Sequence, residues 1–257
     1  MADKTWLFDR PWTRNFTKVR QDFISALLLE IRKQVQLQTA LDVGCGVGDF
    51  SKFLSDLGLQ VVAVDGREDN VAEAKRRYPH LAFRCANAED LPAAGLGEFD
   101  FVLCCGLLYH LENPFRAVRG LFASATKLLF VETMCVPGNE PIMYLLDEGV
   151  AQDQALNYLA FYPSETCLTK MLYSAGFSHV YLVEKLPVDE LYASTVWRKR
   201  VRTMLVASRV ALNVPGLVRT HGLIRPVEAE IDPWSTRWRK LWVRSAKLKS
   251  AVLKPLR

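Results

Sequence analysis

Hydrophobic and polar residues alternate with two different periods along the first half of the chain. Residues 18–36 carry apolar side chains at helical spacing, which predicts an amphipathic helix. Beyond this helix, short apolar runs typical of buried strands alternate with helix-like segments. The runs lie at 39–43, 60–65, 81–86, 99–105 and 127–133. Because strands alternate with helices, we expect a mostly parallel sheet covered by helices on both faces, an α/β architecture.

The rhythm breaks between residues 135 and 160, which contain a Pro-Gly-Asn run and show no clear period. We expect an insertion or lid there. The segment "PSETCLTKMLYSAGF" predicts a helix with Ser164 as its N-cap and Gly176 past its end, and two late strands complete the pattern. The sequence therefore predicts an N-terminal extension and helix, an α/β domain that contains the insertion, and a C-terminal tail. Their predicted bounds are 1–37, 38–211 and 212–257.

The charged residues and the cysteines add two expectations, one about the C-terminal tail and one about the cellular compartment. The net charge is +5, but eight Lys or Arg and no acid lie between Trp234 and Arg257. Without those eight, acidic residues outnumber basic ones, so the basicity belongs to the tail. The six cysteines lie mostly in apolar segments without paired metal spacing, which predicts no metal site and a reducing compartment. With no membrane-spanning run and no secretory signal, we expect a cytoplasmic protein.

The tail places three tryptophans, Trp234, Trp238 and Trp242, four residues apart. At that spacing they share one stripe of a helix whose other positions are largely Lys and Arg. This pattern predicts a basic helix lying on an anionic membrane surface, at the cytoplasmic face. Two other interpretations stay open: a helix packed on the domain with a solvated basic face, and a nucleic-acid contact.

The segment "LDVGCGVGDFS", residues 41–51, sits between a predicted strand and a predicted helix. Gly44, Gly46 and Gly48 let a ligand lie directly on the backbone, near the free N–H groups of the following helix. Asp42 ends the strand, and Asp65 ends the next strand, where an acid would hold a ribose hydroxyl. The spacing differs from the G-x-G-x-x-G of dinucleotide enzymes.

Four segments in order, "LDVGCGVGDFS", "VVAVDGRE", "CANAEDLP" and "FDFVLCCGLLYHLENP", resemble the successive motifs of class I S-adenosylmethionine-dependent methyltransferases. The resemblance covers roughly residues 38–208 and implies a Rossmann-like sheet of seven strands, the last one antiparallel. It implies that the methionine end of the cofactor lies over the glycines, that Asp65 accepts from both ribose hydroxyls, and that Asn87, Ala88 and Glu89 line the adenine. Asn87 stands where many relatives have Asp. The whole implied cofactor set is Asp42, Gly44, Cys45, Gly46, Gly48, Asp65, Gly66, Arg67, Asn87, Ala88, Glu89 and Gly106.

Three residues are candidates for the chemistry. A methyl group on a sulfonium is already activated, so the protein must mainly align the acceptor, and a general base helps when the acceptor is a hydroxyl. His110 follows the fourth strand, at the edge where α/β sheets bind substrates, and histidine titrates near neutral pH. It is either this base or a structural residue of its loop. Tyr109 would shape the substrate site, and Glu132 would either bind a substrate hydroxyl or cap a loop.

The "GLLYHLENP" block is similar to a subgroup that contains a wobble-uridine carboxymethyl-transferring tRNA enzyme and many sugar and small-molecule O-methyltransferases. We expect an O-methyltransferase for a small molecule, a sugar or a lipid-linked glycan. A tRNA-modifying enzyme is the second hypothesis, weakened because the chain outside the tail is mildly acidic. A non-catalytic binding module on the same fold is the third. The oligomeric state and the acceptor atom stay open.

Overall fold

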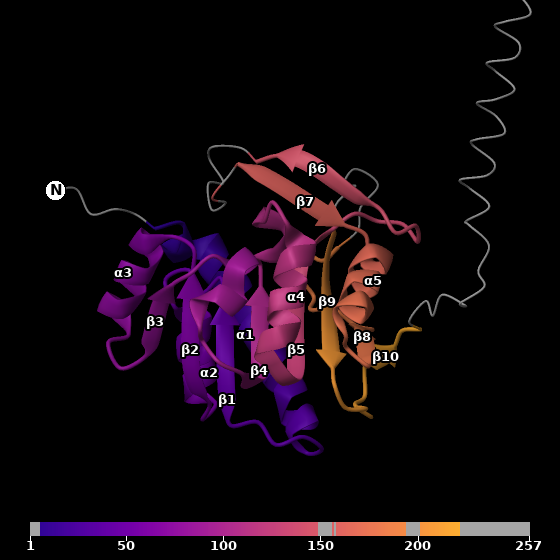
Figure 1. Ribbon diagram of the computed structural model, residues 1–257, viewed down its shortest axis with the longest axis horizontal. Coiled ribbons are helices and arrows are strands. Elements are labelled where there is room, and N and C mark those ends of the chain that lie inside the picture. Colours follow the sequence, from indigo (N-terminus) through magenta and orange to yellow (C-terminus); the bar gives the residue numbers. More distant parts are fainter. Residues whose placement is uncertain (1–5, 149–155, 157, 194–200, 222–257) are drawn as a thin grey trace, which may run out of the picture. The chain divides into compact units, whose positions relative to one another are not determined.

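The apolar runs form the strands of one central sheet (Figure 1). The computed structural model describes residues 6–148, 156, 158–193 and 201–221. Within them the sheet has eight strands, in the order β10-β8-β9-β5-β4-β1-β2-β3. Their bounds are β1 Thr39–Val43, β2 Gln60–Asp65, β3 Ala82–Cys85, β4 Phe99–Cys105, β5 Ala125–Cys135, β8 His179–Val183, β9 Val201–Ser208 and β10 Leu217–Arg219.

Strands β1 to β5 pair in parallel, whereas β9 is antiparallel to both β5 and β8, and β10 is antiparallel to β8. Strands β1 and β4, in the interior of the sheet, are buried almost throughout. Side chains on both faces of these strands must therefore be apolar, which is why their sequences read as unbroken hydrophobic runs. The predicted mostly parallel, Rossmann-like sheet is confirmed, but it has eight strands rather than the seven predicted, because β10 pairs with β8 at the edge.

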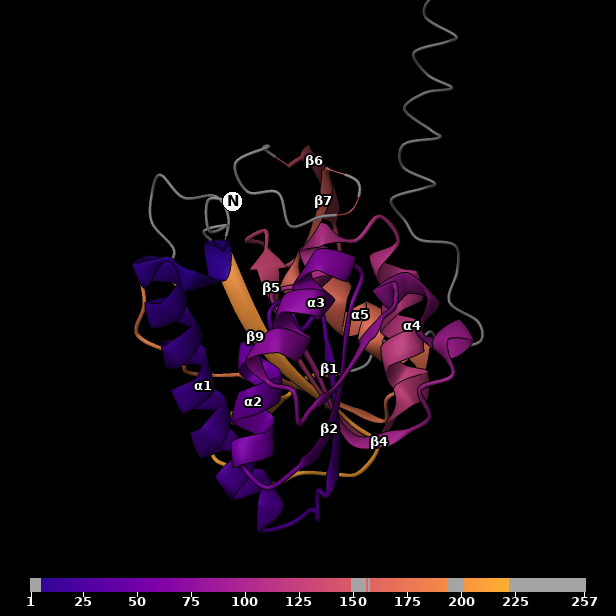
Figure 2. The ribbon, with the colours of Figure 1, turned by 90° about the vertical axis from the view of Figure 1, so that its left-hand side faces the viewer.

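Helices cover both faces of the sheet (Figure 2). Helices α1 and α2 pack on one face through a core that includes Ile24 and Leu54. Helices α4 and α5 pack on the other face, through Val118 and Leu172 among others. The bounds are α1 Pro11–Arg32, α2 Asp49–Asp56, α3 Glu68–Arg77, α4 Pro114–Ser124 and α5 Glu165–Ala175, with short 3-10 turns η1 Leu7–Asp9, η2 Ala88–Ala94 and η3 Leu108–His110.

The predicted insertion contains an antiparallel hairpin, β6 Met143–Asp147 and β7 Leu159–Pro163. The hairpin lies across the edge of the sheet where the parallel strands end (Figure 1). Tyr162 of the hairpin packs edge-on against Tyr109 of η3, with ring centroids 5.6 Å apart. The hairpin ends at Ser164, which caps α5 as predicted, since its Oγ accepts from the backbone N–H of Cys167 at 3.1 Å.

Two boundaries differ from those predicted. Helix α1 begins at Pro11 rather than near residue 18, because proline fits the first helical position, where no intrahelical N–H bond is needed. Past residue 211, Leu212 and Val214 are buried in the core and β10 extends the sheet. The predicted start of the tail at 212 therefore lies inside the packed unit.

The tryptophan stripe predicted for residues 234–257 lies outside the described residues. Within the described part of the chain, no helix combines the length and the hydropathy that crossing a bilayer requires.

Candidate active site

The glycine loop leaves the carboxyl end of β1 and enters α2. Gly44 and Gly46 both have positive φ, +78° and +54°, which L-residues with a side chain rarely adopt. A Cβ on Gly44 would lie 2.8 Å from the side chain of Leu107, and one on Gly46 would lie 2.7 Å from the ring of Phe8. The loop therefore needs glycine for its backbone conformation and for close approach. Cys45 lies buried beneath it, and burial raises the pKa of its thiol well above the usual range.

Asp65 holds this loop against the end of β2. Its Oδ2 accepts from the backbone N–H of Gly46 at 2.9 Å, and its Oδ1 accepts from the N–H of Arg67 at 2.9 Å and from Nδ2 of Asn70 at 3.1 Å. The side chain is thus fixed by three donors, one from the glycine loop, one from the turn after β2 and one from α3. Of the predicted residues on this side, Asp65, Gly66 and Arg67 come together at the mouth of the sheet.

The opposite wall is built from η2. Asn87 caps this turn, accepting at Oδ1 from the N–H of Glu89 at 3.0 Å. Glu89 in turn accepts from the N–H groups of Glu112 and Asn113, at 2.8 and 3.0 Å, and from Nδ2 of Asn113 at 2.7 Å. The carboxylate of Glu89 therefore ties η2 to the start of α4 and is no freely solvated surface acid.

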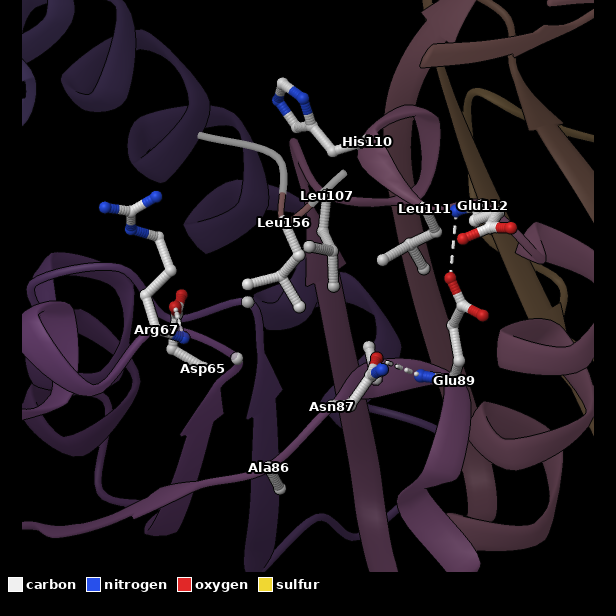
Figure 3. Close-up of a pocket in the computed structure, with 13 residues that line it drawn as sticks. Asp65, Arg67, Ala86, Asn87, Glu89, Leu107, His110, Leu111, Glu112 and Leu156 are labelled. Carbon is white, nitrogen blue, oxygen red and sulfur yellow. Dashed lines mark hydrogen bonds between the residues drawn. The ribbon is translucent and has the colours of Figure 1, made fainter. Parts of the chain in front are cut away.

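A pocket lies between these walls (Figure 3). In this view Asp65 and Arg67 line one side, Asn87 and Glu89 the other, and Ala86 and His110 lie at opposite ends. The lining residues are Gly44, Asp65, Gly66, Arg67, Ala86, Asn87, Ala88, Glu89, Leu107, His110, Leu111, Glu112 and Leu156.

Eight of the predicted site residues line this pocket. The others, Asp42, Cys45, Gly46, Gly48, Gly106, Tyr109 and Glu132, lie outside its lining. The structure adds Leu107 and Leu111 from the "GLLYHLENP" block, and Leu156 from the insertion. The apolar character of that block was the available signal for the first two, whereas nothing in the sequence pattern singles out Leu156.

Asp42 supports the loop from below. It is buried, and its Oδ2 accepts from Oγ of Ser51 in α2 at 2.6 Å. Burial raises the pKa of this carboxyl to about 7, against the opposing hydrogen bond from Ser51. Burial thus favours the protonated form of Asp42, which holds α2 through Ser51.

Relatives with curated names decide the family. A family model described as a methyltransferase domain matches residues 41–124. Ubiquinone biosynthesis O-methyltransferases of Xanthomonas campestris pv. campestris and Xanthomonas oryzae pv. oryzae are 31% and 32% identical over 167 residues, which cover 58% of this chain and 67% of each relative. The chain belongs to the S-adenosylmethionine-dependent methyltransferases.

Solved structures agree with the fold of this methyltransferase. The N-terminal domain of EvdMO1 with bound S-adenosylhomocysteine is 21% identical, with a TM-score of 0.58, over 75% of this chain and 79% of that one. Magnesium protoporphyrin IX methyltransferase from Synechocystis PCC 6803, with bound S-adenosylmethionine, is 20% identical with a TM-score of 0.52, over 81% and 87%. S-adenosylmethionine is the cofactor. The bare glycine backbone and the acid at the end of β2 fit it chemically.

His110 lies on the pocket wall of the methyltransferase. Its side chain is 6% exposed, and its Nδ1 lies 2.6 Å from Oε1 of Glu148, at the end of β6. Among the described residues, both ring nitrogens are buried and neither has a partner in hydrogen-bond geometry. Nδ1 therefore lies at ion-pair distance from a carboxylate, whereas the equally buried Nε2 has no partner of either kind among these residues.

Tyr109 and Glu132 lie behind this wall. Tyr109 accepts at its hydroxyl from Nη2 of Arg202 at 3.0 Å, beneath the hairpin. Glu132 is fully buried, and its carboxylate receives Arg202 Nη1 at 2.8 Å and Arg20 Nη1 at 3.4 Å, with the Tyr192 hydroxyl at 3.3 Å. Burial raises the pKa of Glu132, but the two guanidinium groups outweigh it and hold that pKa below its usual value.

Both oxygens of Glu132 are thus occupied by protein groups. The prediction that Glu132 binds a substrate hydroxyl stays untested, and the observed geometry makes it the counter-ion of Arg20 and Arg202. Groups of His, Cys, Asp and Glu arranged to hold a metal ion are absent from the described part of the chain.

Proposed function

We propose that this methyltransferase transfers the methyl group to a hydroxyl oxygen of a small molecule, with His110 as the general base. The observation that carries the proposal is the unpartnered Nε2 of a buried histidine on the wall of the cofactor pocket. A second support is that the curated relatives are named O-methyltransferases.

The geometry suits this chemistry. Bound S-adenosylmethionine supplies a methyl group activated by the sulfonium. A neutral hydroxyl is a weak nucleophile, so its proton must leave as the oxygen bonds to the methyl carbon. Nε2 of His110 accepts that proton, while Nδ1 stays engaged by Glu148. The largely apolar wall formed by Leu107, Leu111 and Leu156 excludes water and favours an acceptor with an apolar or aromatic body.

Replacing the base tests this proposal. We expect His110→Asn to lower turnover about 10²-fold or more, while calorimetry shows unchanged affinity for S-adenosylmethionine. The matched control is His80→Asn, at an exposed position on the turn between α3 and β3. Turnover that survives in His110→Asn would contradict the base and favour a structural role for this histidine.

The acceptor class needs a separate experiment. Incubating the enzyme and methyl-labelled S-adenosylmethionine with cell extract, then sorting the label into small-molecule, lipid and RNA fractions, tests it directly. We expect the label in an organic-soluble small molecule, a sugar or a lipid-linked glycan. Label confined to RNA would support the alternative of a wobble-uridine tRNA enzyme instead.

The tail suggests that the enzyme works at a membrane surface. The stripe of Trp234, Trp238 and Trp242 beside basic residues supports peripheral attachment to an anionic membrane at the cytoplasmic face, each cation adding about 1 kcal/mol near the surface. Sedimentation with anionic liposomes tests this by comparing the full chain with one that ends at Gly222, after the last packed strand. If both stay in the supernatant at low salt, the tail does not bind membranes.

A further inference from the structure

The contact between His110 and Glu148 joins two separate structural elements, the turn after β4 and the inserted hairpin. His110 belongs to η3, directly after β4, whereas Glu148 follows β6 in the inserted hairpin. The backbone N–H of Glu148 donates to the carbonyl of Tyr158 at 2.8 Å, which fixes Glu148 to the start of β7. The hairpin itself rests on η3 through Tyr162 and Tyr109. Glu148 is therefore held at a defined place over the histidine.

Burial dictates which atoms of this pair carry the proton. The Glu148 side chain is only 5% exposed, and its Oε2 has no hydrogen-bond partner among the described residues. A buried carboxylate is strongly disfavoured unless a donor or a positive charge faces it, and here Nδ1 of His110 lies at ion-pair distance, 2.6 Å from Oε1. A neutral imidazole has one N–H, so a proton held at Nδ1 leaves a lone pair at Nε2.

Nε2 is the nitrogen with no carboxylate beside it, on the residue that lines the pocket. A base at this place needs three groups in a row: the carboxylate, the imidazole and an acceptor hydroxyl that reaches Nε2. Many hydrolytic active sites contain a third side chain that orients the histidine base. It fixes the tautomer of the imidazole and stabilises the imidazolium that forms in the reaction.

We propose that Glu148 is a positioning residue, which holds His110 in the Nδ1–H tautomer and compensates the charge it gains on taking the acceptor proton. This inference rests on the proposed base role of His110. The hairpin is then part of the catalytic apparatus, because the base is correctly protonated only when β6 lies over η3. The proton passes from the acceptor oxygen to Nε2, and the hydroxyl electron pair forms the new bond to the methyl carbon.

The tautomer can be observed without turnover. The chain has four histidines, so ¹⁵N-histidine labelling gives an assignable spectrum, with His110→Asn identifying its signals. In the wild type at alkaline pH we expect Nδ1 protonated and Nε2 unprotonated. In Glu148→Leu, which keeps side-chain volume but cannot accept a hydrogen bond, we expect a mixture of both tautomers and turnover lower by at least about tenfold.

Two further variants complete the design. Glu148→Gln keeps an acceptor oxygen without the charge, so we expect it to retain the tautomer but not full turnover. Glu140→Gln changes an exposed glutamate of the same segment and serves as the matched control. Affinity for S-adenosylmethionine, measured by calorimetry, should be equal in all four proteins and verifies that the variants fold.

The outcomes separate the two proposals. An unchanged His110 tautomer together with wild-type turnover in Glu148→Leu would overturn the positioning role while leaving the base intact. Full turnover in His110→Asn would instead overturn the base, whatever the spectra of the Glu148 variants show. A shifted tautomer with lost turnover, partly restored in Glu148→Gln, supports both.

Discussion

The buried cluster around Glu132 gives the sharpest expectation for stability. Glu132→Gln removes the only carboxylate that faces Arg20 and Arg202 in the described structure, and keeps the volume of the side chain. Both guanidinium side chains are about nine-tenths buried. Removing one partner from such a group typically destabilises by 3–5 kcal/mol, because the remaining charges stay in the interior uncompensated. In a domain of this size that lowers Tm by roughly 6–20 °C.

Urea unfolding of the cofactor-free protein measures this loss. The pKa of Glu132 is lowered by its arginines, so its stabilisation is present above the unfolded pKa of about 4.3 and declines as pH falls below it. The difference between wild type and Glu132→Gln should therefore be constant from pH 8 to 5 and shrink in acid. The triple change Arg20→Met, Glu132→Leu, Arg202→Met should cost less than the single one. A single-variant loss below about 1 kcal/mol, or a triple variant that is worse, would refute the reasoning.

Three further expectations concern the loop and the lid. Burial raises the pKa of Asp42 to about 7, so the wild type loses stability as pH rises from about 4 to 7 and this carboxyl ionises. The free energy of unfolding of Asp42→Asn relative to wild type should therefore rise by up to about 4 kcal/mol between pH 4 and pH 8. A difference in unfolding free energy that does not depend on pH would contradict this. Asp65→Ala should weaken cofactor binding at least roughly tenfold in calorimetry, since a charge-assisted hydrogen bond contributes about 1.5–3 kcal/mol; unchanged affinity would exclude this carboxylate from the site. Ser164→Ala should destabilise by about 1–2 kcal/mol in urea unfolding because α5 loses its cap, and stability equal to wild type would show that the cap is dispensable.

Much of the fold follows from local pattern. The apolar runs of β1, β2 and β4 form strands because both faces of the sheet are covered, and Asp42 and Asp65, at or near the ends of β1 and β2, mark the binding edge. The cofactor walls were predictable for the same reason, since each wall is a contiguous segment following one strand.

The rest depends on residues far apart in the sequence. Glu148 contacts His110 through a hairpin whose strands showed no clear period, so its position carried no signal. Glu132 faces arginines more than 100 residues before it and 70 residues after it, and a lone acid at a strand end resembles a substrate ligand until its partners are seen. The edge strand β10 is three residues long, too short for a periodic pattern.

The bonds of Asp65 have a further consequence, which concerns preorganisation. A carboxylate offers about four lone-pair positions, and three of them already accept from Gly46, Arg67 and Asn70. The side chain is therefore locked in its rotamer before the cofactor arrives, so binding avoids an ordering cost of about 0.5–1.5 kcal/mol. One lone pair, on Oδ2, remains. Asp65 can thus give a full-strength bond to one ribose hydroxyl, and the second hydroxyl must share that oxygen or be bound by another group.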